Sequence, residues 1–344
     1  MSKLVLKNGL EFKGLNFGAN KEVIGELFFN TSMVGYQDIL SDPSYYGKIA
    51  CMTYPLIGNY GLTDEDYDYK NIYVRGYVVK ENNDFPSNFR ATRSLSEAME
   101  ENDIVGIEDI DTRELTKIIR NEGTMLAIIT SDDTPLEECL RKLNEYKEEN
   151  HPVKEVSCKK LWYSRTTNPI YTLVVVDLGV KTTLVKKLNE FGFNVVVVPY
   201  NSTLEQIKKL KPSGVVISNG PGNPNELNEV KELVNSLKGK YPLLGLGLGA
   251  DVIALTYKAK VNKMPSGHQG ANIPVRNLET NKINITSQNH FYEIKDLCEC
   301  VKVTHVSIVN EDIEGFVNVN DKVIGINYQI DEEVINNFVA NMKK

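Results

Sequence analysis

The apolar residues of this chain follow different patterns in its two halves. From residue 171 onward, continuous β-branched runs alternate with amphipathic segments. The runs that read as strands are TLVVVDLG, NVVVVPY, GVVISNG and YPLLGL, and the segments that read as helices are KTTLVKKLNEFG, STLEQIKKLK, NELNEVKELVNSLKGK and ADVIALTYKAK. Apolar strands separated by helices are typical of a parallel sheet covered on both faces. The sequence therefore predicts a doubly wound α/β domain.

The first half lacks this regular alternation. Short strands are predicted at Leu4–Val5, Gly25–Phe29 and Ile72–Val79, between loops rich in Asn, Asp, Pro and Tyr. One segment, DTRELTKIIRNEG, has a clear helical period with a stop at Gly123. This half is predicted to be an α+β domain.

The boundary between the two domains is expected after a charged helix, LEECLRKLNEYKEEN. The stretch that follows, HPVKEVSCKKLWYSRTTNP, is irregular. We therefore predict a first domain over residues 1–150, a linker over 151–170 and a second domain over 171–344.

Composition narrows the functional classes. The chain has 344 residues, 25% of them charged, and a formal net charge of -7. This balance offers no basic surface for nucleic acid or anionic membranes. No apolar run reaches the roughly 18 residues of a membrane span, and the N-terminus does not read as a signal peptide. A cytoplasmic protein is expected.

Cysteine and histidine give no support for a metal site. The five cysteines are scattered and odd in number, which favours reduced thiols. Cys298 and Cys300 form a C-E-C without a second Cys or His pair at zinc-finger spacing. The histidines are dispersed, at His151, His268, His290 and His305. No metal and no cofactor are expected.

A glycine-rich turn, LLGLGLGADVIAL, allows more than one interpretation. Gly245, Gly247 and Ala250 spell G-x-G-x-x-A, as in dinucleotide-binding turns. That reading is disfavoured because the turn follows the fourth strand of its domain and no acid lies between Asp251 and Glu279. The alternatives are a plain glycine-rich turn and a strand-to-helix elbow of the kind that carries a nucleophile, with Gly247 at its centre.

Neighbouring motifs favour the elbow. SNGPGNP, PLLGLGLG, SGHQGANIPV and ITSQNH resemble, in order and spacing, the class I glutamine amidotransferase domain. In the first half, GELFFNTSMVGYQDILSDPSYYGKI, TYPLIGNYG, FPSNFRATRSLSEAM and IVGIEDIDTRELTKIIR are similar to the small subunit of carbamoyl phosphate synthetase. The resemblance covers essentially the whole chain.

That resemblance implies a glutamine-hydrolysing subunit with a Cys-His-Glu triad. In the family, ammonia passes through a tunnel to a large ATP-dependent subunit, which makes carbamoyl phosphate for pyrimidine and arginine synthesis. A thiolate attacks the amide, backbone N–H groups hold the oxyanion, and an imidazole carries the proton to ammonia. The implied partner is the large subunit, in a heterodimer.

This chain departs from the family at all three triad positions. The family's G-I-C-L-G-H-Q aligns with GLGLGAD, so Gly247 stands at the nucleophile position. The family's Y-H-P-E aligns with YQID, so Gln329 replaces the histidine and Asp331 the glutamate. No catalytic residue of the family is intact.

The glutamine pocket is altered as well. The family's Q-N-H-G-F reads QNHFY, so that Asn289 is kept, Phe291 replaces a glycine and Tyr292 follows it. Asp251 replaces a glutamine that would contact the ligand. The pocket elements that the resemblance leaves in place are Gly220, Gly222, the N–H of Leu248, and Ser44 from the first domain.

The preferred interpretation is structural. An elbow holds its centre at a positive φ, which glycine adopts without the strain of other residues, and Phe291 would fill an unused cavity. A new hydrolytic pair formed by Asp251 and Asp331 is the less favoured interpretation. The leading hypothesis is a glutaminase-dead partner of an ammonia-using large subunit; the alternatives are a stand-alone binding or regulatory pseudoenzyme and a working glutamine-hydrolysing subunit.

Overall fold

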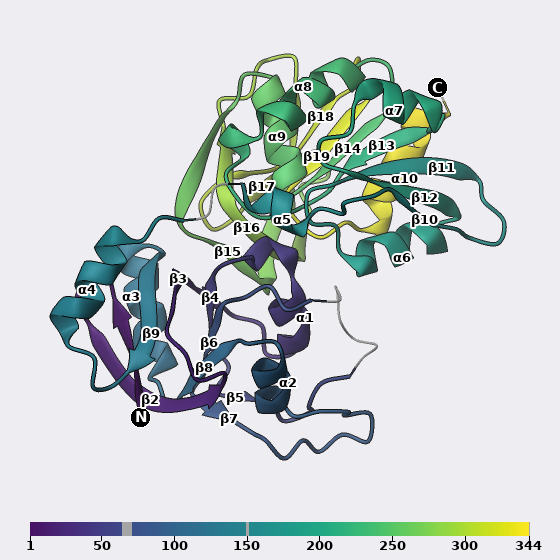
Figure 1. The fold of residues 1–344 in the computed structure, drawn as a ribbon. Coiled ribbons are helices and arrows are strands. Elements are labelled where there is room, and N and C mark those ends of the chain that lie inside the picture. Colours follow the sequence, from purple (N-terminus) through teal and green to yellow (C-terminus); the bar gives the residue numbers. More distant parts are fainter. Residues whose placement is uncertain (64–70, 149–150, 344) are drawn as a thin grey trace. The chain divides into compact units, whose positions relative to one another are not determined.

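The protein is described by a computed structural model that covers residues 1–63, 71–148 and 151–343. The chain divides into two compact units, Met1–Asn150 and His151–Lys344, drawn in purple to blue and in teal to yellow (Figure 1). The boundary between the two units lies at residues 150 and 151.

The first unit is built on a closed barrel of strands. Their order is β1-β2-β8-β6-β4-β3-β9, and β9 closes the barrel by pairing with β1. The barrel strands are β1 (Ser2–Leu6), β2 (Glu11–Gly18), β3 (Val23–Asn30), β4 (Ile49–Met52), β6 (Gly76–Val78), β8 (Val105–Glu108) and β9 (Met125–Ser131). A separate pair is formed by β5 (Leu56–Ile57) and β7 (Glu81–Asn82). The predicted strand at residues 72–79 is shorter than expected.

Alternating side chains of β1 explain how the barrel packs. Leu4 and Leu6 belong to the main core of the unit, whereas Val5, between them, packs with Cys139 and Leu143 of α4 (Leu136–Glu145). Because successive strand residues point to opposite faces, β1 is buried on both sides.

Short helices accompany the barrel, and two of them test the sequence prediction. The helices are α1 (Tyr36–Ser41), η1 (Pro43–Tyr45), α2 (Leu95–Glu101), α3 (Thr112–Glu122) and α4 (Leu136–Glu145). The predicted helix at α3 is confirmed: Asp111 caps its start by accepting from the N–H of Glu114, and Gly123 ends it at φ +91°. The predicted charged helix ends earlier than expected, at Glu145, and its last two predicted residues, 149 and 150, lie outside the described part.

The second unit contains a ten-stranded sheet with the order β10-β12-β11-β13-β14-β19-β18-β16-β15-β17. Its central strands β12, β11, β13, β14 and β19 are parallel to one another. The strands are β10 (Trp162–Ser164), β11 (Tyr171–Asp177), β12 (Phe193–Pro199), β13 (Gly214–Ile217), β14 (Leu243–Leu246), β15 (Lys260–Asn277), β16 (Ile283–Lys295), β17 (Lys302–Ser307), β18 (Ile313–Asn318) and β19 (Val323–Ile326). The predicted parallel sheet is confirmed.

Helices cover both faces of this sheet. They are α5 (Pro152–Val156), α6 (Thr182–Glu190), α7 (Leu204–Lys209), η2 (Pro224–Glu226), α8 (Asn228–Leu237), α9 (Leu248–Thr256) and α10 (Glu332–Met342). Val174 and Val176 of β11 pack in one core with α7, α8 and α9, while Leu173 and Val175 pack in another with α6 and α10. The alternation along one strand thus produces the doubly wound arrangement, whose central strands and helices are visible in Figure 1.

Two features of this unit differ from the prediction. Residues 151–170 do not form a separate linker: they carry α5 and β10, and β10 pairs with β12 in the sheet. The sheet also continues beyond β19 through antiparallel strands β18, β16, β15 and β17. Within the described residues, no helix is long and apolar enough to cross a membrane.

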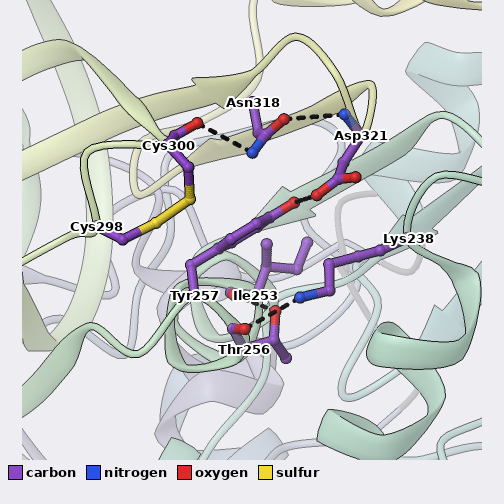
Figure 2. Close-up of a disulfide and its surroundings, with 8 residues drawn as sticks. All are labelled: Lys238, Ile253, Thr256, Tyr257, Cys298, Cys300, Asn318 and Asp321. Carbon is purple, nitrogen blue, oxygen red and sulfur yellow. Dashed lines mark hydrogen bonds between the residues drawn. A yellow bond between two sulfur atoms is a disulfide. The ribbon is translucent and has the colours of Figure 1, made fainter.

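The expectation of reduced thiols is wrong for one pair of cysteines. Cys298 and Cys300 form a disulfide, because the C-E-C spacing places their Cα atoms 5.3 Å apart, within bridging range. Figure 2 shows this disulfide beside Tyr257, whose hydroxyl donates to Asp321 at 2.6 Å. Cys51, Cys139 and Cys158 are free.

Candidate functional site

The centre of the site is the sharp turn between β14 and α9. Gly247 lies between the strand and the helix, with φ +50° and ψ -119°. Its N–H donates to the carbonyl of Ile326 in β19, and its own carbonyl accepts from Asp251 in the first turn of α9. This is the strand-to-helix elbow that the motif predicts, placed at the carboxyl edge of the parallel strands, where ligands bind in such sheets.

The flanking glycines are required for a different reason. A Cβ on Gly245 would lie 2.8 Å from the Cα of Ala250, and one on Gly249 would lie 2.2 Å from the carbonyl oxygen of Ile217. A Cβ on Gly247 meets only Asn219, at 3.2 Å. Gly245 and Gly249 therefore allow close packing of the backbone. At Gly247 there is nearly enough room for a side chain, and the positive φ of the backbone is what favours glycine.

The turn after β13 lies against the elbow. Ser218 and Asn219 belong to this turn, and the hydroxyl of Ser218 accepts from the N–H of Leu178 at 2.9 Å. Gly220 fits tightly, because a Cβ there would lie 1.9 Å from the carbonyl oxygen of Leu178. Gly222 has φ +97°, and a Cβ there would lie 2.8 Å from Pro152. The predicted SNGPGNP turn and the predicted elbow thus occupy the same edge of the sheet.

The remaining triad-equivalent positions follow β19, which pairs with β14. Gln329 is exposed, and its N–H donates to the carbonyl of Ser287 in β16. Asp331 is the N-cap of α10: its carboxylate accepts from the N–H of Val334 at 2.9 Å. Asp331 therefore has a structural role, which satisfies one of the free N–H groups at the start of a helix.

Residues of the predicted glutamine pocket lie on β16. Phe291 is 8% exposed and packs on Gly267, where a Cβ would lie 3.0 Å from its ring. Asn289 and Tyr292 are half-buried, and the carbonyl of Tyr292 accepts from His290 at 2.8 Å. Burial of Phe291 agrees with the interpretation that it fills space.

Asp251 lies in the first turn of α9 and is buried, with 1% of its surface exposed. Its carboxylate accepts from the side-chain amide of Asn327 at 3.2 Å. Burial raises the pKa of Asp251 to about 7, although the nearby His290 acts in the opposite direction. The carboxyl group is therefore close to half protonated at neutral pH.

Leu248 and Ser44 are two further residues of the predicted glutamine pocket. Leu248 is the first residue of α9 and is buried. The N–H groups at the start of a helix have no acceptor within the helix itself. Ser44 lies in η1 of the first unit, where its N–H donates to Asp42. Its contribution to a glutamine pocket stays a prediction.

The sequence interpretation missed one cluster. The histidines are too dispersed in the sequence to suggest a metal site, but the structure brings His268 and His290 together with Glu314. The reason is that His268 and His290 are cross-strand partners in the β15–β16 pair. A hairpin assignment to residues 260–295 is the signal that would have found this cluster.

The charges of His290 and Glu314 stabilise each other. Burial lowers the pKa of His290, but the charge of Glu314 outweighs it and raises the pKa to about 9. Burial raises the pKa of Glu314, and His290 and His268 together lower it to about 2. His290 is therefore an imidazolium and Glu314 a carboxylate at neutral pH.

Comparison with known families assigns both units. Residues 4–129 match the family model of the carbamoyl-phosphate synthase small chain, CPSase domain, and residues 174–328 match glutamine amidotransferase class-I. The pyrimidine-specific small chain of carbamoyl phosphate synthase from Bacillus subtilis is 42% identical over 91% of this chain and 86% of its own length. The small chains from Clostridium perfringens and Listeria monocytogenes are 41% and 43% identical over 91% and 92% of this chain, and 89% and 87% of their own lengths.

The doubly wound sheet, the elbow after β14 and the family match define the second unit as a class I glutamine amidotransferase domain. With the CPSase domain before it and relatives that match over nearly the whole chain, the chain belongs to the carbamoyl phosphate synthase small-chain family.

Proposed function

We propose that this chain is a carbamoyl phosphate synthase small subunit that does not hydrolyse glutamine and that supports a large subunit using free ammonia. The observation that carries the proposal is the elbow itself. Its backbone has the form that presents a nucleophile, but its central residue, Gly247, has no side chain. Nucleophilic hydrolysis of an amide requires a side chain at that point.

Neither of the other triad-equivalent residues supplies the missing chemistry. Gln329 carries an amide, which does not exchange protons near neutral pH and so cannot replace an imidazole as general base. Asp331 is engaged in capping α10. A nucleophile added at the elbow would have no base to activate it and no carboxylate positioned to orient that base.

The pocket residues also argue against glutamine as a ligand. Phe291 puts a buried aromatic ring at the position of the family's glycine. Asp251 puts a carboxyl group at the position of the family's glutamine, and that group is buried and bonded to Asn327. A substrate with its own carboxylate would meet a partly ionised carboxyl there.

Partnership with a large subunit is proposed from the family. The first unit has kept the CPSase domain, and the relatives are small chains of a synthase, a name that implies a larger chain. The product would be carbamoyl phosphate, used in pyrimidine or arginine synthesis in the cytoplasm, with the two chains forming a heterodimer. The chain itself would need no cofactor.

The test uses the full chain purified from its native cells under gentle salt conditions. We expect a large synthase chain to co-purify, and we expect the complex to make carbamoyl phosphate from ammonium salts and ATP but not from glutamine. A small chain that hydrolyses glutamine serves as the positive control with the same large chain.

Other outcomes distinguish the alternatives. Recovery without any large chain would contradict the proposal and favour a stand-alone binding or regulatory protein. Equal rates with glutamine and ammonium would show that the chain hydrolyses glutamine. If substitution of Gly247 did not change the glutamine-dependent rate, the nucleophile would lie elsewhere in the chain.

A further inference from the structure

His268, His290 and Glu314 are brought together by strand pairing in the second unit. His268 on β15 and His290 on β16 are directly opposite each other in the antiparallel register. Glu314 lies on β18, which pairs with β16. Opposed residues of two strands point to the same face of the sheet, and the two imidazole rings are 5.1 Å apart.

The donor atoms of these side chains converge. The Nδ1 atom of His268 lies 3.1 Å from Oε1 of Glu314, and Nε2 of His290 lies 3.5 Å from Oε2. One donor atom from each residue lies within 4.8 Å of the others. A tetrahedral zinc ion with bonds of about 2.0–2.1 Å holds its ligand atoms about 3.4 Å apart. The three atoms are therefore near the spacing that one ion requires.

One of these atoms has no hydrogen-bond partner among the described residues. The Oε2 atom of Glu314 is buried and unbonded, and the side chain is fully inaccessible to solvent. A buried carboxylate oxygen without a hydrogen bond is costly, and the charge of His290, whose Nε2 lies 3.5 Å from this oxygen, offsets only part of that cost. A cation bound at Oε2 would supply the interaction that this oxygen lacks.

Surrounding groups hold the ligands in orientation. Nδ1 of His290 donates to the carbonyl of Tyr292, which directs Nε2 toward Glu314. A histidine ligand with its second nitrogen fixed by a carbonyl is the usual arrangement in metal sites. On the other side, the side-chain amide of Asn310 lies 3.2 Å from Nε2 of His268 and also donates to the carboxylate of Asp312.

A fourth oxygen is already in place. Oε1 of Gln288 lies 2.8 Å from Nδ1 of His268 and 3.1 Å from Nε2 of His290. The amide nitrogen of Gln288 donates to Thr286, which keeps the oxygen turned toward the histidines. Two imidazoles and a carboxylate, with an amide oxygen beside them, are a donor set that suits zinc better than calcium or magnesium.

We propose that His268, His290 and Glu314 form a binding site for a divalent transition metal, with zinc as the best match and Gln288 as the fourth ligand. A bound ion would displace the proton of His290 to solvent, the carboxylate of Glu314 would supply one negative charge, and the carboxyl group of Asp251 lies near His290. His268 is 11% exposed at its side chain, which gives the ion a path from solvent. The site does not depend on glutamine hydrolysis.

The test is zinc titration of the full-length protein after removal of metals with a chelator. We expect one zinc ion per chain by calorimetry and elemental analysis. Cobalt(II), used as a spectroscopic probe, should give the intense visible absorption of a tetrahedral site. Glu314→Gln and His268→Asn should each weaken zinc binding by at least about a hundredfold, since even outer groups of metal sites are worth ten- to a hundredfold.

Two controls separate this site from other zinc ligands. His151→Asn changes an exposed histidine outside the cluster and should leave zinc binding unchanged. The double variant Cys298→Ser, Cys300→Ser removes the only neighbouring pair of cysteines in the sequence and should also retain one zinc ion. Fluorescence of Trp162 reports whether each variant is folded.

Absence of zinc and cobalt binding by the wild-type protein would overturn the proposal, and this result needs no variant. Binding that survives both Glu314→Gln and His268→Asn, or that is lost in the cysteine variant, would place the ion elsewhere.

Discussion

Replacing Gly247 by alanine tests whether the elbow keeps glycine to avoid strain. At φ +50° and ψ -119°, a residue with a side chain is expected to be strained by about 1–3 kcal/mol. The new Cβ would lie 3.2 Å from that of Asn219, so the neighbour must shift by a few tenths of an ångström. Restriction of the unfolded chain offsets about 0.4–1 kcal/mol. The net loss of unfolding free energy should be about 1–2 kcal/mol.

Urea unfolding followed by fluorescence measures this change in the right unit, because the single tryptophan, Trp162, lies in β10 of the second unit. Two matched variants bracket the result. Gly239→Ala also places alanine at a positive φ, but only Asp321 lies within 4 Å of the added Cβ, at 3.6 Å, so it should cost about 1 kcal/mol. Gly249→Ala would force a Cβ to 2.2 Å from a backbone oxygen and should cost at least about 3 kcal/mol.

A Gly247→Ala variant that is as stable as the wild type, or more stable, would show that glycine is not kept at the elbow to avoid strain. Glycine would then be present for another reason, such as the close approach of a ligand to the backbone.

Three further predictions concern the same site. Burial raises the pKa of Asp251 to about 7 from an ordinary value near 4, so the stability that its protonated form contributes is complete below pH 4 and is lost as the pH rises through 7. In the presence of a chelator, the unfolding free energy should therefore fall by about 2 kcal/mol between pH 5 and pH 8, and Asp251→Asn should remove this decline. An unchanged decline in the variant would contradict the prediction. Gly247→Cys alone should release no ammonia from glutamine, because a lone thiol is only a few per cent ionised at neutral pH. Weak activity should require Gln329→His and Phe291→Gly as well. Turnover of glutamine by the single variant at a rate typical of the family would show that another residue acts as the base. Asp331→Ala should lower the unfolding free energy by about 1 kcal/mol through loss of the α10 cap, and a neutral result would show that the cap is not needed.

The alternation of strands and helices after residue 171 was sufficient to predict the parallel part of the second unit. Each of these strands is buried on both faces, so the apolar runs are continuous and easy to recognise. The elbow was also predictable, because its glycines are required by local packing and backbone conformation. These signals lie within a few residues of one another in the sequence.

Features that depend on distant partners were not predictable in the same way. The barrel of the first unit closes through the pairing of β1 with β9, and nothing local in Ser2–Leu6 identifies that partner. The His268–His290–Glu314 cluster depends on the register of β15 and β16 and on the position of β18. The role of Asp331 was ambiguous because a triad-like position and a helix cap both favour an acidic residue.

The order of strands in the second unit also bears on its behaviour in concentrated solution. On one side of the sheet β17 pairs with both β15 and β18, so its backbone groups have partners on two sides. On the other side β10 is the outermost strand in the described part of the sheet, and it is three residues long. Lys159 and Lys160 precede it and Arg165 follows it. A short strand between positive charges is a poor template for adding a strand from another molecule, so the sheet resists edge-to-edge aggregation although Trp162 and Tyr163 are partly exposed there.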